Sequence, residues 1–382
     1  VTPSAILADD AIPVPSGAVR LRLADLPDAT PLQSPVQSAP EDPAYIVVTS
    51  GTSNTPLGVI HAHRAILGRQ PMFDGWYGLR SDDRIFHAGA FNWTYTLGTG
   101  LLDPWTLGAT ALVPGLDVGA EMLPLLLKRN EASIFAASPG VFRRLLRHEP
   151  LQLPRLRHSL SAGEKLPDSL RQRWRSATGT DIHEAFGQSE CSTFISGSPS
   201  RPAPRDSLGF AQEGRAVAVL GDNGPVPRGE LGEIAIHRAE PGLMLGYAGG
   251  AQPRFSGDWY MTGDMGVMRE DGALFYQGRN DDILTAGGFR LSPIEIEDAM
   301  LHCPGITEAA AVDHRLSPET VVVALHYASE VAISDDILRA HAEAHLARHK
   351  QPRLFFHHTS LPRNQNGKLL RRRLRAANEA GP

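Results

Sequence analysis

Residues 134 to 190 read IFAASPGVFRRLLRHEPLQLPRLRHSLSAGEKLPDSLRQRWRSATGTDIHEAFGQSE, and this stretch decides the fold. The apolar run at 134–137 predicts a buried strand, and further strands are expected around Leu160 and at 182–186. An amphipathic helix is expected after each of the first two, and the second begins near residue 167 and ends before Gly179. Strand, helix, strand, helix and strand at this spacing predict a parallel sheet with right-handed crossovers.

Ligands of such sheets bind at the carboxyl ends of the strands. The segments that follow the second and third predicted strands are Ser161-Ala162-Gly163-Glu164 and Gly187-Gln188-Ser189-Glu190. We therefore expect both segments on one functional edge of the sheet.

The remaining chain changes its pattern twice. From about residue 205 the segments are short, β-rich and separated by turns, which predicts antiparallel strands up to 280. After residue 280 we expect a helix near 293–301, strands at 309–312 and 320–326, and a helix that begins at Ser334. The predicted organisation is a large α/β domain at 1–280, in which 205–280 is an antiparallel β subdomain, and a small α+β domain at 281–382.

Composition excludes several classes of protein. The 382 residues carry 37 Lys+Arg and 42 Asp+Glu, a net charge of −5, so we expect no binding to nucleic acid or to a membrane surface. No stretch has the length of a membrane span. Cys191 and Cys303 are the two cysteines, and a disulfide framework is not expected. These features favour a cytoplasmic protein.

A second loop, TSGTSNTPLGV at 49–59, follows an apolar run at 45–48. Its hydroxyls and glycines are typical of a loop that binds an anion through backbone N–H groups, although a polar turn is the alternative. The loop lacks the lysine of a Walker-type phosphate loop.

The order of the motifs after this loop is specific. They read AFGQSE at 185–190, WYMTGD at 259–264, GRNDD at 278–282, GGFRLSPIEIE at 287–297 and LPRNQNGK at 361–368. As a set they resemble the adenylate-forming superfamily of acyl-CoA synthetases, carrier-protein adenylation domains and luciferases, over residues 44–375. The resemblance implies parallel sheet layers with flanking helices, a small β-barrel-like subdomain and a mobile α+β C-terminal domain. It also implies that a carboxylic acid, ATP and Mg²⁺ give an acyl-adenylate, whose acyl group passes to coenzyme A.

The same resemblance implies which residues bind the nucleotide. Those for the outer phosphates are Thr49, Ser50, Gly51, Thr52 and Ser53. Those around the base are Gly163, Glu164, Phe186, Gly187 and Ser189. Asp264 and Arg279 are expected at the ribose, because one carboxylate accepts hydrogen bonds from two hydroxyls. Glu190 is expected to bind Mg²⁺, which prefers carboxylate oxygen.

Three further roles follow from the resemblance. Lys368 is the expected catalytic residue for adenylation, where it bridges the acid and the α-phosphate. Asp281 is the expected hinge of the small domain. Gly288 and Arg290 are expected to enter the site for the second step, when Gly288 leaves room for pantetheine and Arg290 contacts phosphate. Arg371, Arg372, Arg373 and Arg375 are interpreted as a solvated helix face, with attraction of a phosphate-bearing substrate as the weaker alternative.

The acid pocket is expected around residues 87–98. Trp93, Tyr95 and Gly98 are its candidates, with Gly288 from the small domain, although buried core aromatics explain Trp93 and Tyr95 nearly as well. Amino-acid-activating relatives have aspartate after phenylalanine here, whereas this chain has Phe91-Asn92. That favours a simple carboxylic acid, and the run LRHSLSAGEKLP resembles aryl- and small-acyl-CoA ligases of the benzoate type.

Two departures from the family pattern carry expectations. Only 48 residues precede the TSGT loop, where the family has well over a hundred, so we expect an N-terminally shortened member or a fragment. Exposed apolar surface on the remaining sheet is then expected to favour a homodimer. In the loop, Asn54 and Leu57 replace the usual glycine and lysine, and Thr285 also stands where lysine is common, which predicts a weaker grip on the triphosphate.

Three functions remain open from the sequence. The first is an AMP-forming acid–CoA ligase, with a simple acid, ATP and coenzyme A as its small-molecule partners. The second is a stand-alone adenylating enzyme that loads the pantetheine of a carrier protein. The third is a catalytically silent nucleotide-binding protein.

Overall fold

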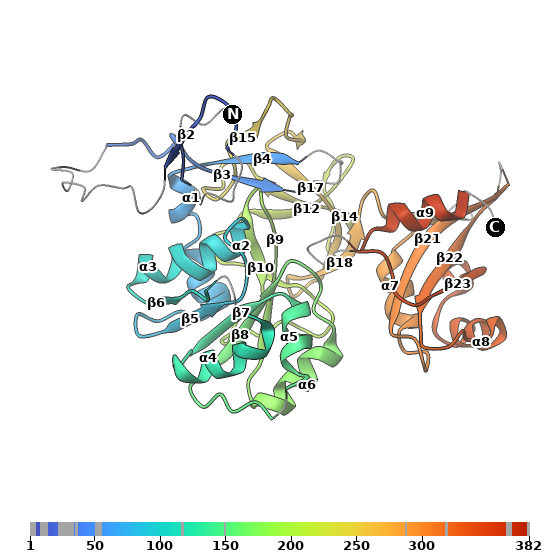
Figure 1. Cartoon of the computed structure of the whole chain (residues 1–382). Helices are drawn as coiled ribbons and strands as arrows, with labels where there is room; N and C mark the ends of the chain where they lie inside the picture. The colour runs from blue at the N-terminus through green and yellow to red at the C-terminus, as the bar shows by residue number, and fades with distance from the viewer. Residues whose placement is uncertain are drawn as a thin grey trace.

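A computed structural model describes residues 5–7, 14–21, 34, 37–49, 56–115, 118–148, 150–286, 289–317, 320–363 and 369–379. Its centre is one large mixed sheet (Figure 1). The parallel part runs in the order β9-β8-β7-β5-β6, and its strands are Ile182–Gln188, His158–Ala162, Ile134–Ala137, Arg84–His87 and Thr110–Leu112. This confirms the parallel sheet that the sequence predicts.

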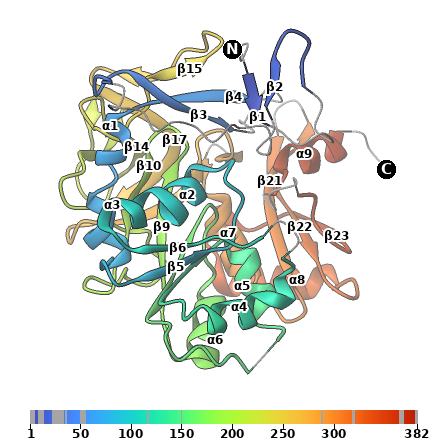
Figure 2. The same ribbon diagram turned by 60° about the vertical axis from the view of Figure 1, so that its left-hand side comes forward.

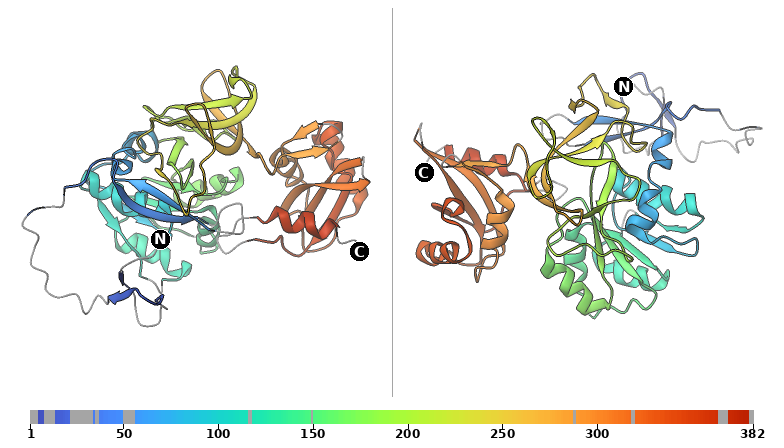
Figure 3. Two further views of the ribbon diagram at one scale, coloured as in Figure 1. Left: turned by 90° about the horizontal axis from the view of Figure 1, so that it is seen from above. Right: turned by 180° about the vertical axis from the view of Figure 1, so that it is seen from behind.

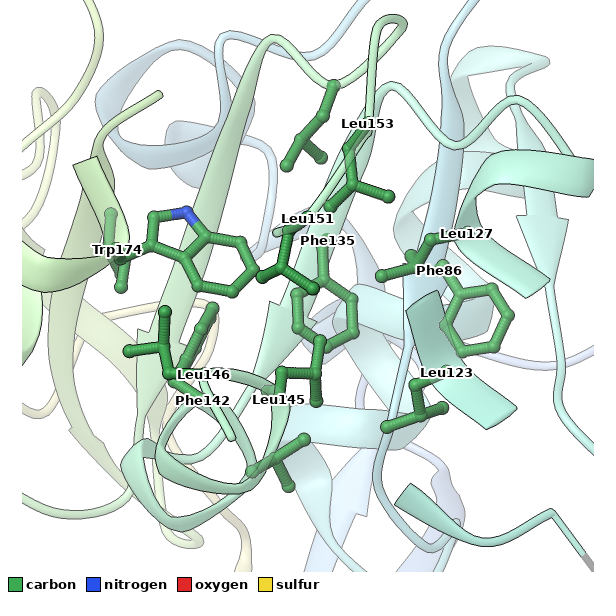
Figure 4. Close-up of a cluster of buried hydrophobic side chains, with 14 of the residues drawn as sticks. Phe86, Leu123, Leu127, Phe135, Phe142, Leu145, Leu146, Leu151, Leu153 and Trp174 are labelled. Carbon is green, nitrogen blue, oxygen red and sulfur yellow. The ribbon is translucent and has the colours of Figure 1, made fainter. Parts of the chain in front are cut away.

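The main core lies where helices pack on the parallel strands. The helices are α4 (Leu123–Arg129), α5 (Pro139–Leu145) and α6 (Asp168–Thr178). Trp174 of α6 packs against Phe135 of β7 and Phe142 of α5, with ring centroids 6.1 and 4.8 Å away (Figure 4). β7 and β8 are buried throughout, and the continuous apolar sequence of β7 is typical of a strand that is covered on both faces.

The sheet continues as antiparallel strands after β9. The chain turns back at residues 189–191 into β10 (Ser192–Ser196), which pairs antiparallel with β9. Beyond β10 the order is β11-β18-β17-β14-β12-β13, and these strands are Gly209–Ala211, Ala273–Arg279, Trp259–Met268, Leu231–His237, Val217–Gly221 and Gly224–Pro225. A short strand, β16 (Phe255–Ser256), pairs with β17. The predicted antiparallel region thus shares its hydrogen-bonded ladder with the parallel strands.

A separate three-stranded sheet carries the ends of the TSGT loop. Its order is β15-β4-β3, with strands Gly246–Ala248, Leu57–Ala62 and Pro43–Thr49. Thr49 pairs with Leu57 across the hairpin. Near the N-terminus β1 (Ala5–Leu7) and β2 (Val19–Leu21) form a parallel pair.

The segment between β4 and β7 contains several short helices besides β5 and β6. In addition to α4, its α-helices are α1 (Arg64–Leu67), α2 (Thr94–Leu97) and α3 (Asp103–Leu107). Two π-helical turns, Phe73–Tyr77 and Gly98–Leu102, and a 3₁₀ turn at Ala120–Met122 complete it.

The C-terminal residues form a small α+β unit with its own core (Figures 1 and 3). Its sheet is β21-β22-β23 (Glu308–Ser317, Thr320–Ala328, Leu354–His358), after a short hairpin of β19 (Leu284–Ala286) and β20 (Phe289–Leu291). The helical segments are α7 (Pro293–Met300), α8 (Asp335–His345), a 3₁₀ turn at Arg348–Lys350 and α9 (Arg371–Glu379). Ser334 precedes α8 as expected but makes no side-chain cap, whereas the Ser292 hydroxyl caps α7.

The ribbon of the small unit lies beside that of the large unit (Figure 2), and side chains of both units bind across the boundary. Lys165, after β8, donates to Asp298 of α7 at 2.8 Å. The Ser292 hydroxyl donates to the carbonyl oxygen of Gln277 on β18 at 2.7 Å. Within the described ranges, no helix is both long and apolar enough to cross a membrane.

Candidate active site

The turn between β9 and β10 holds the QSE segment. Gly187 is required there, because a Cβ at this position would lie 2.1 Å from the carbonyl oxygen of Ser192. Below the turn, the ring nitrogen Nε2 of His61 lies 2.8 Å from the carbonyl oxygen of Ser189. His61 is buried, and desolvation lowers its pKa to about 4, so the ring is neutral and donates from Nε2 to that carbonyl near pH 7. The turn is therefore fixed from two sides.

Glu190 lies in this turn and is partly exposed. The hydroxyl of Tyr247 donates to its Oε1 at 2.9 Å. Within the described part of the chain its other carboxylate oxygen has no hydrogen-bond partner, so it remains available to a cation. The described residues contain no group of three or more His, Cys, Asp or Glu side chains that could hold a metal ion. Glu190 therefore suits Mg²⁺, which binds through one or two carboxylates together with substrate phosphates and water.

Asp264 is buried on β17, opposite Arg279 of β18. Its carboxylate accepts hydrogen bonds from the Tyr276 hydroxyl at 3.0 Å, from Arg279 at 3.2 Å and from the amide of Gln188. Burial and the adjacent Asp264 raise the pKa of Tyr276, so its phenol stays protonated. The hydroxyls of a bound ribose would therefore have to share the carboxylate oxygens of Asp264 with these donors, or displace the donors.

Phe186 of β9 is partly buried beside this cluster. Its ring lies 5.6 Å from that of Tyr276 and packs edge-on against Phe194 at 5.5 Å. The arrangement leaves an aromatic surface close to Asp264, as a base and its ribose require.

A cavity of about 170 Å³ joins the QSE turn to the predicted acid pocket. Its lining residues are Trp93, Thr94, Tyr95, Ala162, Gly163, Gly187, Gln188, Ser189, Ser192 and Thr193. Five of the predicted site residues thus meet at one cavity. Gly163 has a φ of +99°, and a Cβ there would lie 2.5 Å from the Trp93 ring, so glycine lets the indole lie close to the loop after β8.

Tyr95 is fixed behind this cavity. Its hydroxyl donates to the carbonyl oxygen of Leu160 at 3.0 Å, and its ring packs edge-on against Trp93 at 5.1 Å. His87 contacts the other side of the Tyr95 ring at 4.3 Å. Desolvation lowers the pKa of His87 to about 3, so a neutral imidazole backs the pocket.

Gly98 and Glu164, although predicted for the site, do not line this cavity. Gly98 lies beside the guanidinium of Arg69, and a Cβ there would approach that group to 2.0 Å, so Gly98 makes room for Arg69 and not for a ligand. Glu164 is half-buried, and desolvation raises its pKa against the attraction of Arg143 and of Arg363 in the small unit.

The remaining predicted residues lie at or beyond the limits of the described chain. Ser50, Gly51, Thr52, Ser53, Gly288 and Lys368 lie outside the described residues. Thr49 ends β3 at the base of the loop, and the backbone of Arg290 pairs with Thr285. Asp281 is exposed, and its carboxylate lies 3.5 Å from the guanidinium of Arg279.

The arginines of α9 correct one interpretation. Arg372 and Arg373 are exposed, as expected. Arg371, by contrast, donates from one guanidinium nitrogen, Nη2, to both carboxylate oxygens of the buried Glu297, at 2.8 and 2.7 Å. Arg375 pairs with Asp313 at 2.8 Å. A solvated face is wrong for these two, because the side of α9 that buries Leu374 also turns Arg371 and Arg375 toward the acidic side chains of the small unit.

Sequence reasoning missed Tyr247, Tyr276, Gln188 and Arg69. Gln188 lies within a segment that was placed on the functional edge, so its neighbours were a usable signal. Tyr247 approaches Glu190 and Tyr276 approaches Asp264 only through strand pairing, which no local sequence pattern predicts.

Comparison with known proteins decides the family. The AMP-binding enzyme model matches residues 6–248, and the model of the AMP-binding enzyme C-terminal domain matches residues 295–368. This chain belongs to the AMP-binding enzyme family. A curated relative in that family is the mitochondrial acyl-coenzyme A synthetase ACSM2 of Rattus norvegicus, 29% identical over 371 residues, which are 92% of this chain and 64% of the relative. The benzoate–CoA ligase of Thauera aromatica is 28% identical, over 88% of this chain and 66% of its own.

Solved structures of AMP-binding enzymes agree with the fold. The anthranilate CoA ligase AuaEII in complex with anthranoyl-AMP has a TM-score of 0.79 and 30% identity, over 90% of this chain and 69% of that chain. ATP-bound MatB from Rhodopseudomonas palustris has a TM-score of 0.83 at 22% identity, over 94% and 75%, and supports the fold alone. The chain spans somewhat less than two thirds of the length of the curated relatives it matches.

Proposed function

We propose that this chain catalyses AMP-forming ligation of a small carboxylic acid to coenzyme A. One observation carries the proposal: a single cavity joins Trp93 and Tyr95 to the turn that holds Glu190. Asp264, which contacts Gln188 of the same turn, lies beside the aromatic surface of Phe186. An acid and a nucleotide bound at these two places would lie side by side, as the attack of a carboxylate on the α-phosphorus requires.

Each group has a separate task in this proposal. Glu190 would hold Mg²⁺, which supplies charge neutralisation at the phosphates. Asp264 and Arg279 would orient the ribose, and Phe186 the base. Thr49 and residues 50–53 would bind the outer phosphates, and Lys368 would stabilise the charge that develops between acid and α-phosphate.

The second step is part of the same proposal. Residues 1–280 and 281–382 would act as two domains, supported by their separate cores. Rotation at Asp281 would bring the segment with Gly288 and Arg290 to the site for thioester formation. A cytoplasmic enzyme is also proposed, supported by the free thiols of Cys191 and Cys303.

Acid-dependent exchange of pyrophosphate into ATP tests the first step. We expect exchange with small aromatic acids such as benzoate and anthranilate, which the names of two relatives suggest. Lys368→Ala should abolish the exchange. Lys128→Ala should not, because Lys128 is exposed on α4 away from the proposed site.

Two results would favour the other hypotheses. ATP binding in calorimetry without exchange, for any acid in a broad panel, would overturn ligase activity and indicate a silent nucleotide-binding protein. Acyl transfer to the pantetheine of a carrier protein, with none to free coenzyme A, would replace coenzyme A as the acceptor.

A further inference from the structure

Ser192 occupies an unusual position in the wall of the cavity. It begins β10, two residues after Glu190, and lines the cavity beside Thr193. Its φ is +61°, a left-handed conformation that costs energy for a residue with a side chain. Such a conformation persists only where surrounding contacts determine it, and it is enriched at functional sites.

Those contacts come from a buried ion pair. Arg69 is 3% exposed and Asp103 is 1% exposed, and two guanidinium nitrogens donate to the two carboxylate oxygens at 2.7 and 2.6 Å. The Tyr77 hydroxyl donates to the same carboxylate at 2.7 Å. The third guanidinium nitrogen, Nη1, donates to the hydroxyl oxygen of Ser192. A charge held on three sides therefore fixes the position of this hydroxyl.

Because the Ser192 hydroxyl is the acceptor in that hydrogen bond, its own hydrogen atom is free to be donated to another group. The Ser192 oxygen accepts from Arg69, so its own hydrogen must be donated elsewhere. No protein acceptor for it lies within hydrogen-bonding distance in the described ranges. A hydroxyl that accepts from a cation is also polarised into a stronger donor. Since Ser192 lines the cavity, the missing acceptor is best supplied by the bound acid.

The cavity restricts what that acid can be. About 170 Å³ is below the roughly 300–1,000 Å³ of sites for drug-sized ligands, so the acid is small. Trp93 and Tyr95 form two aromatic walls at an interplanar angle of 86°. The hydroxyl of Thr193 is already used, since it contacts the sulfur of Met72 at 2.6 Å. A flat ring against these walls, with a polar atom toward Ser192, satisfies both size and chemistry.

We propose that Ser192 is a specificity-determining residue, held by Arg69, that donates a hydrogen bond to an acceptor atom on the ring of a small aromatic or heteroaromatic acid. This inference rests on the proposed ligase function. It adds that the preferred acid carries an acceptor on its ring in addition to the carboxylate.

Benzoate and the three pyridinecarboxylates test the proposal, because a ring nitrogen adds an acceptor with little change in size. Acid-dependent ATP–pyrophosphate exchange is measured at pH 8, where the pyridine nitrogen is unprotonated. We expect at least one isomer to exceed benzoate in kcat/KM by about tenfold, as one hydrogen bond allows. Ser192→Ala should remove that preference, so that the favoured isomer and benzoate have about the same kcat/KM in the variant.

Other outcomes would overturn the proposal. One is that the wild type prefers no isomer over benzoate, and another is that the preference is unchanged in Ser192→Ala. A third is that Ser192→Ala lowers kcat/KM equally for all acids, which would mean that Ser192 serves only as a hydrogen-bond partner of Arg69. Ser192→Gly removes the same hydroxyl and relieves the left-handed strain, so it gives the same test if the alanine variant folds poorly. Absence of exchange with every acid in the wild type would instead overturn the ligase function, and this inference with it.

Discussion

Two arginine–carboxylate networks of this protein look alike and differ in their surroundings. Arg69 and Asp103 lie in the large unit with almost no exposed surface. Arg371 and Glu297 lie in the small unit, where their side chains are 16% and 10% exposed. Arg371 also lies 3.6 Å from Asp282, the residue that follows the predicted hinge Asp281. The first network is buried and binds Ser192 in the wall of the cavity. The second network connects the start of α9 to Asp282, next to the boundary between the units. We therefore expect the first to control stability and the second to control catalysis.

The largest expected effect is on stability. Asp103→Asn should lower the free energy of unfolding by about 3–5 kcal/mol, because Arg69 would keep a buried charge without its anion. Urea denaturation measures the change. The exposed pair Arg175–Asp181 gives the matched control, and Asp181→Asn should cost less than about 0.5 kcal/mol. If both variants lower the free energy of unfolding by the same amount, the burial of the Arg69–Asp103 pair does not make it more important for stability than an exposed pair.

A third pair, Arg171–Glu184, sharpens the comparison through pH. Desolvation raises the pKa of Glu184 from 4.5 to about 7 against the attraction of Arg171. The folded state therefore holds the proton more tightly than the unfolded state, and the contribution of Glu184 to stability falls as pH rises from 4.5 to 7. The unfolding free energy of the wild type relative to Glu184→Gln should fall by on the order of 3 kcal/mol over this window and stay level above it. A difference that does not vary with pH would show that Glu184 is ionised throughout.

Arg371→Lys tests the second network. Lysine keeps the charge but has a single nitrogen, whereas Arg371 faces Glu297 with Nη2 and Asp282 with Nη1, so the start of α9 should be positioned less well. We expect ATP–pyrophosphate exchange to fall by roughly tenfold, with a smaller change in thermal stability than Asp103→Asn causes. Arg372→Lys is the control, since Arg372 is exposed. If exchange stays at the wild-type rate, the network is a structural contact alone.

The smallest expected effect concerns a position that lacks a charge. Leu57 pairs with Thr49 at the base of the TSGT loop. Leu57→Lys should lower the apparent KM for ATP by at most about tenfold, the value of one charge-assisted contact. Val331→Lys adds the same charge at an exposed position of the small unit and should leave the KM unchanged. An unaltered KM in Leu57→Lys would argue against a phosphate role for this loop.

The sequence predicts best what depends on local patterns. The strand β7 is found because its apolar run is buried on both faces, and α6 because Asp168 and Gly179 mark its ends. The cavity residues Gly163, Gly187 and Ser189 follow from the rule that parallel strands end at one edge.

The networks could not be predicted, because their members meet only through tertiary packing. Arg69 lies 34 residues from Asp103 and 123 from Ser192 along the chain. Gly98 was assigned to the pocket because the family resemblance places acid-pocket residues in its segment, yet the π-helical turn that it begins places it beside Arg69. Arg371 lies 74 residues from Glu297, and nothing near Arg371 in the sequence distinguishes it from the exposed Arg372.

The turn at residues 280–283 is fastened to both units. The N–H of Asn280 donates to the carbonyl oxygen of Gly263 in the large unit at 2.7 Å, and the N–H groups of Asp282 and Ile283 donate to the carbonyl oxygen of Arg279 at 3.1 and 2.9 Å. On the other side, Asp282 lies 3.6 Å from both Arg371 and Arg375 of α9. If the small unit swings about Asp281, as the family resemblance predicts, the hydrogen bonds to Arg279 have to break, whereas the ion pairs of Asp282 would let α9 move together with the turn.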